Sequence, residues 1–159
     1  MKANPVLSDL LNRLLADELA AISEYMVHSE MCAEWGYKKL HKALKHQAKD
    51  EMKHAEWLIE RIITLEGQPE VSKPRPIKIA RSIPDMIGSN EAGEETAIDA
   101  YNRAVVTARQ GNDEGTAELC ARILAMEEGH LEWAERQRRQ IADMGLPAYL
   151  SRQTKGASY

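Results

Sequence analysis

The pattern Glu-x-x-His occurs twice in this chain, at Glu51–His54 and at Glu127–His130. Each copy lies deep inside a long stretch of helical periodicity, where residues three apart share one face of a helix. Each copy therefore directs a carboxylate and an imidazole toward the same point. A fold for this chain must give these two helices a common polar pocket.

Glycine and proline residues divide the sequence into four long helical segments and a short fifth. The four long helices are expected to cover about residues 4–34, 38–66, 82–110 and 112–144. The tail helix is expected to begin at 147 and to end between 150 and 153. Asn4, Ser82 and either Asn112 or Asp113 have the side chains of N-caps, and Gly67 is the expected C-cap of the second helix.

The connections between these segments indicate how the helices are arranged. Residues 68–81 contain three prolines and can run the length of a bundle, whereas the breaks near Gly36 and Gly111 are short. Short connections place helices antiparallel and side by side. The sequence therefore predicts an all-α four-helix bundle with one long crossover and a short C-terminal fifth helix, in a single domain over residues 1–159 with the bundle at about 4–144. The tail helix is too short to be stable alone, so we expect it to dock, with a neighbouring subunit as a candidate, and to fray from about Ser151.

Composition supports a helical core and narrows the function classes. The chain has no phenylalanine and only 5% aromatic residues, so Leu, Ile, Ala and Met must build the core. A net charge of −4 argues against nucleic acid as a partner, and no run of about 18 uncharged apolar residues could span a membrane. The start lacks a signal-peptide pattern and two cysteines are too few for a disulfide framework, so we expect a cytoplasmic protein.

Four glutamates and two histidines fall on the otherwise apolar stripes of the four long helices, each near the middle of its helix. They are expected to meet at one level of the bundle. Glu94 is preferred to Glu91 and Glu95 by its place on the stripe, and Glu127 to Glu128 by its spacing from the histidine. The six candidate metal ligands are Glu18, Glu51, His54, Glu94, Glu127 and His130.

The charge of these residues predicts what they bind. Buried carboxylates without counter-charge are too costly to keep ionised, and two divalent cations would neutralise four of them. Oxygen-rich ligation with one imidazole per ion suits iron or manganese better than structural zinc. A single Glu-x-x-His would be a solvated surface pair, but two copies in register favour a metal site. Tyr25 and Tyr101, on the same stripes, are either core tyrosines, supports for the ligands or redox-active phenols.

A second apolar stripe on the first helix predicts a contact outside the bundle. Leu15, Leu19, Ile22 and Met26 are expected to face away from the metal ligands, and Met52 points about 100° away from its neighbour Glu51. From the residues alone, Met52 is either an interface residue or a soft ligand.

Longer segments match the pattern of a known family. They are Asn12…Leu14-Leu15…Glu18-Leu19, Asp50-Glu51-Met52-Lys53-His54-Ala55, Ile59-Glu60-Arg61-Ile62…Leu65-Glu66-Gly67, Glu127-Glu128-Gly129-His130 with Trp133, and Met144-Gly145-Leu146…Tyr149-Leu150. From about residue 6 to 150 the chain resembles bacterioferritin, the haem-containing member of the ferritin-like di-iron superfamily. The likeness is weakest over residues 68–90 and in much of the third helix.

The resemblance implies a ferritin-like bundle that assembles as a homo-oligomer into a hollow shell of twenty-four subunits. Each subunit's di-iron centre would act as a ferroxidase, oxidising Fe(II) to Fe(III) with O2 or H2O2, and the cavity would store ferric mineral. The six candidates would be the iron ligands, with Glu51 and Glu127 bridging and Tyr25 supporting the site. A ferredoxin-type protein is the implied reductant.

The resemblance also assigns residues outside the di-iron centre. Met52 matches the axial ligand of a haem b held between two subunits on a two-fold axis. His46 and Asp50 match positions that bind iron at the inner shell surface in some members. The family commonly has Tyr-His-Glu before this stretch, whereas this chain has Lys45-His46-Gln47. This departure bears on the passage of iron by way of the inner surface and not on the di-iron ligands.

Other function classes share such a bundle. A di-metal oxidase or peroxidase acting on a small molecule would turn over repeatedly without forming mineral. A non-catalytic haem-binding shell subunit would require an incomplete metal site, whereas all six candidate ligands are present. A rubrerythrin-like peroxidase typically adds a Cys-x-x-Cys iron domain, which two isolated cysteines exclude, and mini-ferritins lack the paired motif.

Overall fold

The computed structural model describes residues 5–154, and this range forms five α-helices. They are α1 (Pro5–Glu34), α2 (Lys38–Thr64), α3 (Ile83–Gln110), α4 (Glu114–Met144) and α5 (Leu146–Gln153). The prediction of an all-α four-helix bundle with one long crossover and a short fifth helix is confirmed. The predicted N-cap Asn4 lies outside the described residues.

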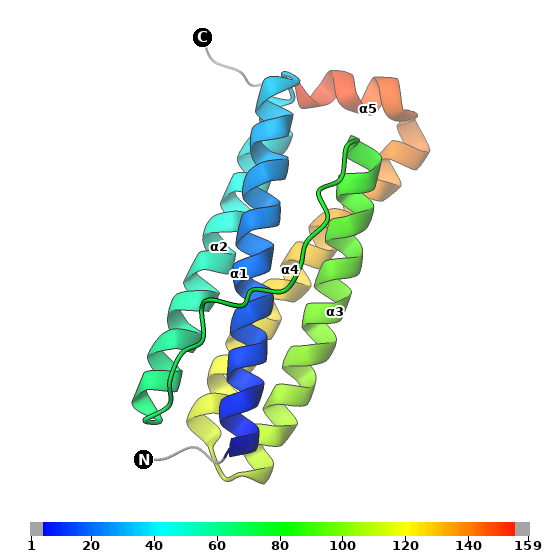
Figure 1. The fold of residues 1–159 in the computed structure, drawn as a ribbon. Helices are drawn as coiled ribbons and strands as arrows, with labels where there is room; N and C mark the ends of the chain where they lie inside the picture. The colour runs from blue at the N-terminus through cyan, green and yellow to red at the C-terminus, as the bar shows by residue number, and fades with distance from the viewer. Residues whose placement is uncertain (1–4, 155–159) are drawn as a thin grey trace.

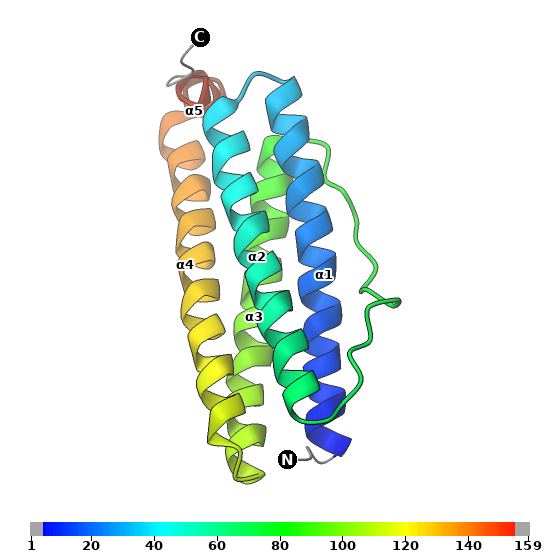
Figure 2. The ribbon, with the colours of Figure 1, turned by 90° about the vertical axis from the view of Figure 1, so that its left-hand side faces the viewer.

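The four long helices form two antiparallel hairpins, α1 with α2 and α3 with α4 (Figure 1). The crossover between α2 and α3 runs along the outer side of α1 from one end of the bundle to the other (Figure 2). Hydrogen bonds fasten it there: the Arg75 amide donates to the Ala16 carbonyl at 3.3 Å, and the Asn12 side chain donates to Gln68 O at 3.1 Å. The crossover therefore spans the bundle, as the three prolines and its length predicted.

The helix ends agree with the predicted caps except at the end of α2. Ser82 caps α3 through the Asp85 amide at 3.2 Å, and Asp113, rather than Asn112, caps α4. The prediction of Gly67 as the C-cap glycine was wrong, because α2 ends at Thr64 and Glu66 takes the left-handed conformation (φ 60).

Gly67 is needed for another reason. Its amide donates to the Ile62 carbonyl at 2.8 Å, and an added Cβ would lie 3.0 Å from a methyl group of Ile62. The glycine therefore allows the chain to pass close to the last turns of α2.

The tail helix α5 docks on its own bundle, across the end where α1 and α2 connect (Figure 1). Tyr149 is fully buried and donates a hydrogen bond to the Gln137 side chain at 2.7 Å. The helix continues to Gln153, the later of its two predicted ends, and the Gln153 side chain is buried against it. The expectation of fraying was therefore wrong for residues 151–153, and residues 155–159 lie outside the described part of the chain. A neighbouring subunit is not required to hold this helix.

Two apolar clusters fill the bundle, one toward each end. The first, toward the end where α3 and α4 connect, is built mainly of leucine, isoleucine and alanine, and the second contains Tyr25, Cys32 and the residues around α5. Cys32 and Cys120 are both buried and form no disulfide. Leu15 is fully buried in the first cluster, so its predicted place on an outward-facing stripe was wrong, while Leu19 and Ile22 are partly buried. Among the described residues, none of the helices has the length and apolar character needed to cross a membrane.

Candidate metal centre

The six candidate ligands meet between the two apolar clusters, in the middle of the bundle. Each long helix contributes to this group: one glutamate from α1, one from α3, and a glutamate and a histidine from each of α2 and α4. All six side chains are buried, and none of the residues is more than 8% exposed. The placement follows from the sequence, because each helix carries its apolar stripe toward the bundle axis and the six residues interrupt those stripes at one level.

The six residues form two overlapping groups of possible ligand atoms. Within each group the atoms lie within 4.8 Å of one another, and Glu51 and Glu127 belong to both. One group adds Glu18 and His54, and the other adds Glu94 and His130. Two cations placed in these groups would share two carboxylates and have one carboxylate and one imidazole each.

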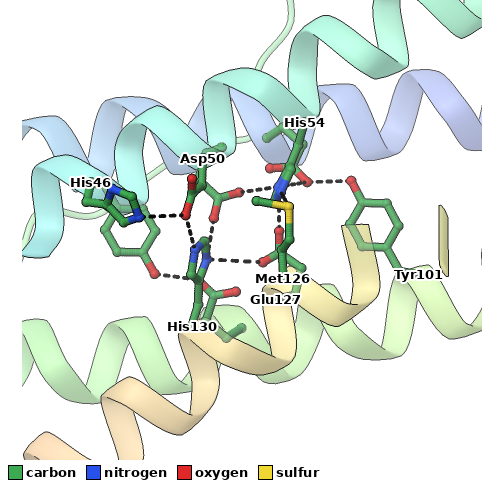
Figure 3. Close-up of polar contacts among 11 residues, drawn as sticks. His46, Asp50, His54, Tyr101, Met126, Glu127 and His130 are labelled. Atoms are coloured by element: carbon green, nitrogen blue, oxygen red, sulfur yellow. Dashed lines mark hydrogen bonds and ion pairs between the residues drawn. The ribbon is translucent and has the colours of Figure 1, made fainter. Parts of the chain in front are cut away.

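Both imidazoles turn Nδ1 toward the carboxylates. His54 Nδ1 lies 2.8 Å from Glu127 Oε1 and 3.4 Å from Glu51 Oε2. His130 Nδ1 lies 2.9 Å from Glu51 Oε1 and 3.5 Å from Glu94 Oε1. The two rings lie 6.3 Å apart between centroids, and Figure 3 shows both beside Glu127.

Several of these buried atoms lie at ion-pair distance from one another but lack hydrogen-bond geometry. Within the described residues, Nδ1 of both histidines and one oxygen each of Glu51, Glu94 and Glu127 have no hydrogen-bond partner. Buried polar atoms are normally satisfied, so such a concentration needs an explanation. Atoms that point into a common space rather than at a partner fit cation ligands.

The electrostatics of the group favour a cation in the same way. Burial, with help from neighbouring carboxylates, raises the pKa of Glu18 and Glu127 well above the usual value. Burial opposes a charge on the imidazoles, but contacts with the carboxylates outweigh it and raise the pKa of His54 to about 12 and of His130 to about 11. Burial also opposes the ionised form of Glu51, yet its contacts with Glu18 and the two imidazoles lower its pKa. Without a cation, protons must supply the positive charge that the carboxylates require.

Glu18 and Glu94 each belong to only one of the two groups, and we call them the outer glutamates. Each of them accepts a hydrogen bond from a tyrosine across the bundle. Tyr25 on α1 donates to Glu94 on α3, and Tyr101 on α3 donates to Glu18 on α1 (Figure 3 labels Tyr101). The hydroxyl groups therefore link the two hairpins reciprocally. Of the roles that the sequence left open for these tyrosines, support of the glutamates is the one that this geometry favours.

The outer nitrogens of the two histidines have partners that the sequence did not reveal. His130 Nε2 lies 3.0 Å from Asp50 Oδ2, and His54 Nε2 lies 3.3 Å from Met126 Sδ (Figure 3). The family resemblance points to Asp50 only at the inner surface, and it does not point to Met126. Each directly precedes the glutamate of a Glu-x-x-His motif, and this is the one sequence signal that points to them.

The residues assigned to other sites lie outside this group. His46 is exposed and lies 3.6 Å from Asp50, which connects it to the group through His130 (Figure 3). Met52 is 49% exposed on α2 and contributes no ligand atom to either group. Met26 on α1 is 54% exposed and lines a shallow apolar groove with Val27 and Met31. Met52 and Met26 are therefore accessible for a contact outside the bundle, and that contact stays a prediction.

A cavity of about 290 Å³ lies between α1 and α3, against the outer glutamates. Its walls include small residues, among them Ala21, Gly93 and Ala97, and the crossover reaches it through Arg75. Arg75 forms an ion pair with Asp17 at 3.1 Å. The cavity is large enough for a small molecule such as O2 beside the candidate ligands.

Comparisons with known proteins agree with this geometry. A family model described as a ferritin-like domain matches residues 8–144. The chain is 37% identical to a bacterial ferritin from Synechocystis sp. over 96% of its length and 99% of that protein. It is 32% identical to a bacterioferritin from Mycolicibacterium paratuberculosis over 94% of each chain. A solved structure of Mycobacterium tuberculosis bacterioferritin, BfrA, superposes with a TM-score of 0.95 at 29% identity and covers 98% of both chains. The chain therefore belongs to the ferritin family, among the bacterioferritins.

Proposed function

We propose that this protein is an iron-storage ferroxidase, which oxidises Fe(II) to Fe(III) with O2 or H2O2 at the centre described above and retains the ferric product. The observation that carries the proposal is the pair of overlapping groups, each with carboxylates and one imidazole, buried at the middle of the bundle. The proposed ligands are Glu18, Glu51, His54, Glu94, Glu127 and His130.

The residues of this chain perform three tasks in the proposed reaction. The glutamates neutralise two Fe(II) ions and, as anionic oxygen ligands, stabilise the higher charge of Fe(III). The imidazoles exchange their Nδ1 protons for the ions, so iron binding releases protons. The bound iron supplies the electrons, one from each ion, and the oxidant accepts them.

Assembly and haem binding are part of the proposal. The family makes this chain a homo-oligomer, and we propose a hollow shell of twenty-four copies with one haem b between Met52 of two copies. Exposed Met52 on α2 and exposed Met26 on α1 support an interface formed by this hairpin. We further propose that His46 and Asp50 hand iron toward the inner surface, that a ferredoxin-type protein supplies electrons for release, and that the protein works in the cytoplasm.

Removal of a ligand tests the metal centre. In Glu127→Ala the shared carboxylate is lost, so we expect an intact assembly with rapid Fe(II) oxidation abolished. The measurement is an anaerobic Fe(II) titration of the purified assembly, followed by air and stopped-flow absorbance. Exposed Glu128, the adjacent residue, gives the matched control Glu128→Ala, which should oxidise iron like the parent. Unchanged kinetics in Glu127→Ala would refute the site, and repeated turnover without mineral would favour a small-molecule oxidase.

The haem proposal has a separate test. Met52→Leu should yield a haem-free protein that still oxidises Fe(II), because Met52 lies outside the metal centre. Haem absorbance of the purified protein is the measurement, and haem retained in the variant would remove Met52 from the proposal.

A further inference from the structure

The two imidazoles of the metal centre differ on their outer side. Both present Nδ1 to the carboxylates, and both place Nε2 within hydrogen-bond reach of one side chain (Figure 3). For His130 that side chain is Asp50, at 3.0 Å, and for His54 it is Met126, at 3.3 Å. The geometry is alike on the two sides, but the chemistry is not.

This difference matters when a cation binds. An imidazole that binds a metal through Nδ1 carries its proton on Nε2 and must donate it. A carboxylate is a strong acceptor, which fixes the ring and makes it a more basic ligand. A thioether sulfur is a weak acceptor and does neither well.

Nothing else among the described residues replaces the missing acceptor. The His54 side chain is fully buried, and Met126 is the one hydrogen-bond partner found for its Nε2. The ring is held by packing instead: Trp57 lies 5.9 Å away between ring centroids, and the Arg122 guanidinium covers the indole at 4.0 Å. These packing contacts restrict the position of the ring, but they provide no acceptor for its Nε2 proton.

The rest of the centre treats its two halves alike. Each outer glutamate accepts a hydrogen bond from one tyrosine, and each half has one histidine and the same two shared glutamates. The partner of the outer nitrogen is therefore the main chemical difference between the halves.

We infer that the centre consists of two unequal half-sites, and that Met126 is the positioning residue that makes them unequal. The half-site of His130 and Glu94 takes the first divalent cation and holds it more tightly. The half-site of His54 and Glu18 takes the second and releases it more readily. This inference rests on the proposed two-metal centre and adds an order of filling to it.

The native protein provides the first test. Crystals prepared anaerobically with one Co(II) per chain should show, by anomalous scattering, several-fold higher occupancy beside His130 than beside His54. Equal occupancies, or higher occupancy beside His54, would overturn the inference and leave the metal centre standing. Cobalt absent from both half-sites would overturn the proposed centre itself, so the two failures are distinguishable.

Substitution of Met126 provides the second test, by equilibrium dialysis against Co(II). A glutamine or glutamate side chain reaches about as far as methionine. Met126→Glu should therefore raise the affinity for the second cation by about 10–100-fold, and Met126→Gln should raise it by less. Met126→Leu offers no acceptor and should bind like the parent. Asp50→Asn is the counterpart on the other side and should weaken the first cation. Equal tightening of both cations in Met126→Glu would indicate a general charge effect and overturn the positioning role.

Discussion

At the scale of single residues, the reciprocal Tyr–Glu contacts join α1 to α3, and so the two hairpins, at the metal centre. Tyr25 and Tyr101 each occupy a predicted apolar stripe, but their hydrogen bonds cross from α1 to α3. Stripe position showed that these tyrosines face inward. It could not show which glutamate each would meet, because that depends on how far the two hairpins are shifted along their axes.

Tyr101→Phe separates support of the centre from ordinary stability. Loss of the hydroxyl removes a buried hydrogen bond to Glu18 and should lower the free energy of unfolding by about 1–2 kcal/mol. It should also weaken Co(II) binding by about tenfold, as loss of a group that orients a ligand commonly does. Tyr149→Phe is the matched control, since its buried hydroxyl serves Gln137 far from the ligands and its loss should reduce stability only. Equal cobalt affinity in the two variants would contradict the supporting role.

At the scale of the elements, caps and the crossover fix where each helix begins and how the hairpins are joined. Asp113 caps α4 through the Thr116 amide at 3.0 Å and also accepts a hydrogen bond from Arg61 on α2 at 2.6 Å. One side chain therefore starts a helix and ties the two hairpins at one end of the bundle. The sequence indicated the cap, whereas the contact with Arg61 required the packed structure.

Substitution of Asp113 should distinguish these two roles. Asp113→Ala removes both interactions and should lower the free energy of unfolding by about 2 kcal/mol, whereas Asp113→Asn keeps a good N-cap and should lose about half as much. Ser82→Ala at the start of α3 loses a cap alone and should lower the free energy of unfolding by about 1 kcal/mol. Thermal or denaturant unfolding measures all three. Equal losses for the alanine and asparagine variants at 113 would mean that the cap itself contributes little.

At the scale of the whole molecule, the buried metal centre links stability to pH. In the folded protein without cations, the pKa of His54 is about 12 and that of His130 is about 11, against about 6.5 in an unfolded chain. The raised pKa values of Glu18 and Glu127 act in the same direction. The folded state therefore binds more protons than the unfolded state above pH 6.5, and stability must fall as pH rises.

The pH dependence gives a direct measurement. In the presence of a chelator, the unfolding temperature should decrease between pH 6.5 and 9, because the histidine contribution is complete only below pH 6.5 and is lost as pH rises toward the folded pKa values. Cations displace these protons, so the stabilisation gained from added Co(II) should grow over the same range. His130→Gln removes one of the proton sites and should flatten the chelated curve. An unfolding temperature that rises with pH under chelation would show that the imidazoles are not held protonated.

The sequence by itself determined the helices and the six residues at their centre, because an apolar stripe and a cap are local properties of a single segment. Local pattern also explains the errors: fraying over residues 151–153 and the outward-facing position of Leu15 were inferred without the neighbouring elements that bury Gln153 and Leu15. Only the tertiary structure decided that Asp50 would meet His130 and Met126 would meet His54. Those contacts depend on the rotation and axial shift of α2 against α4, and helical periodicity leaves both free.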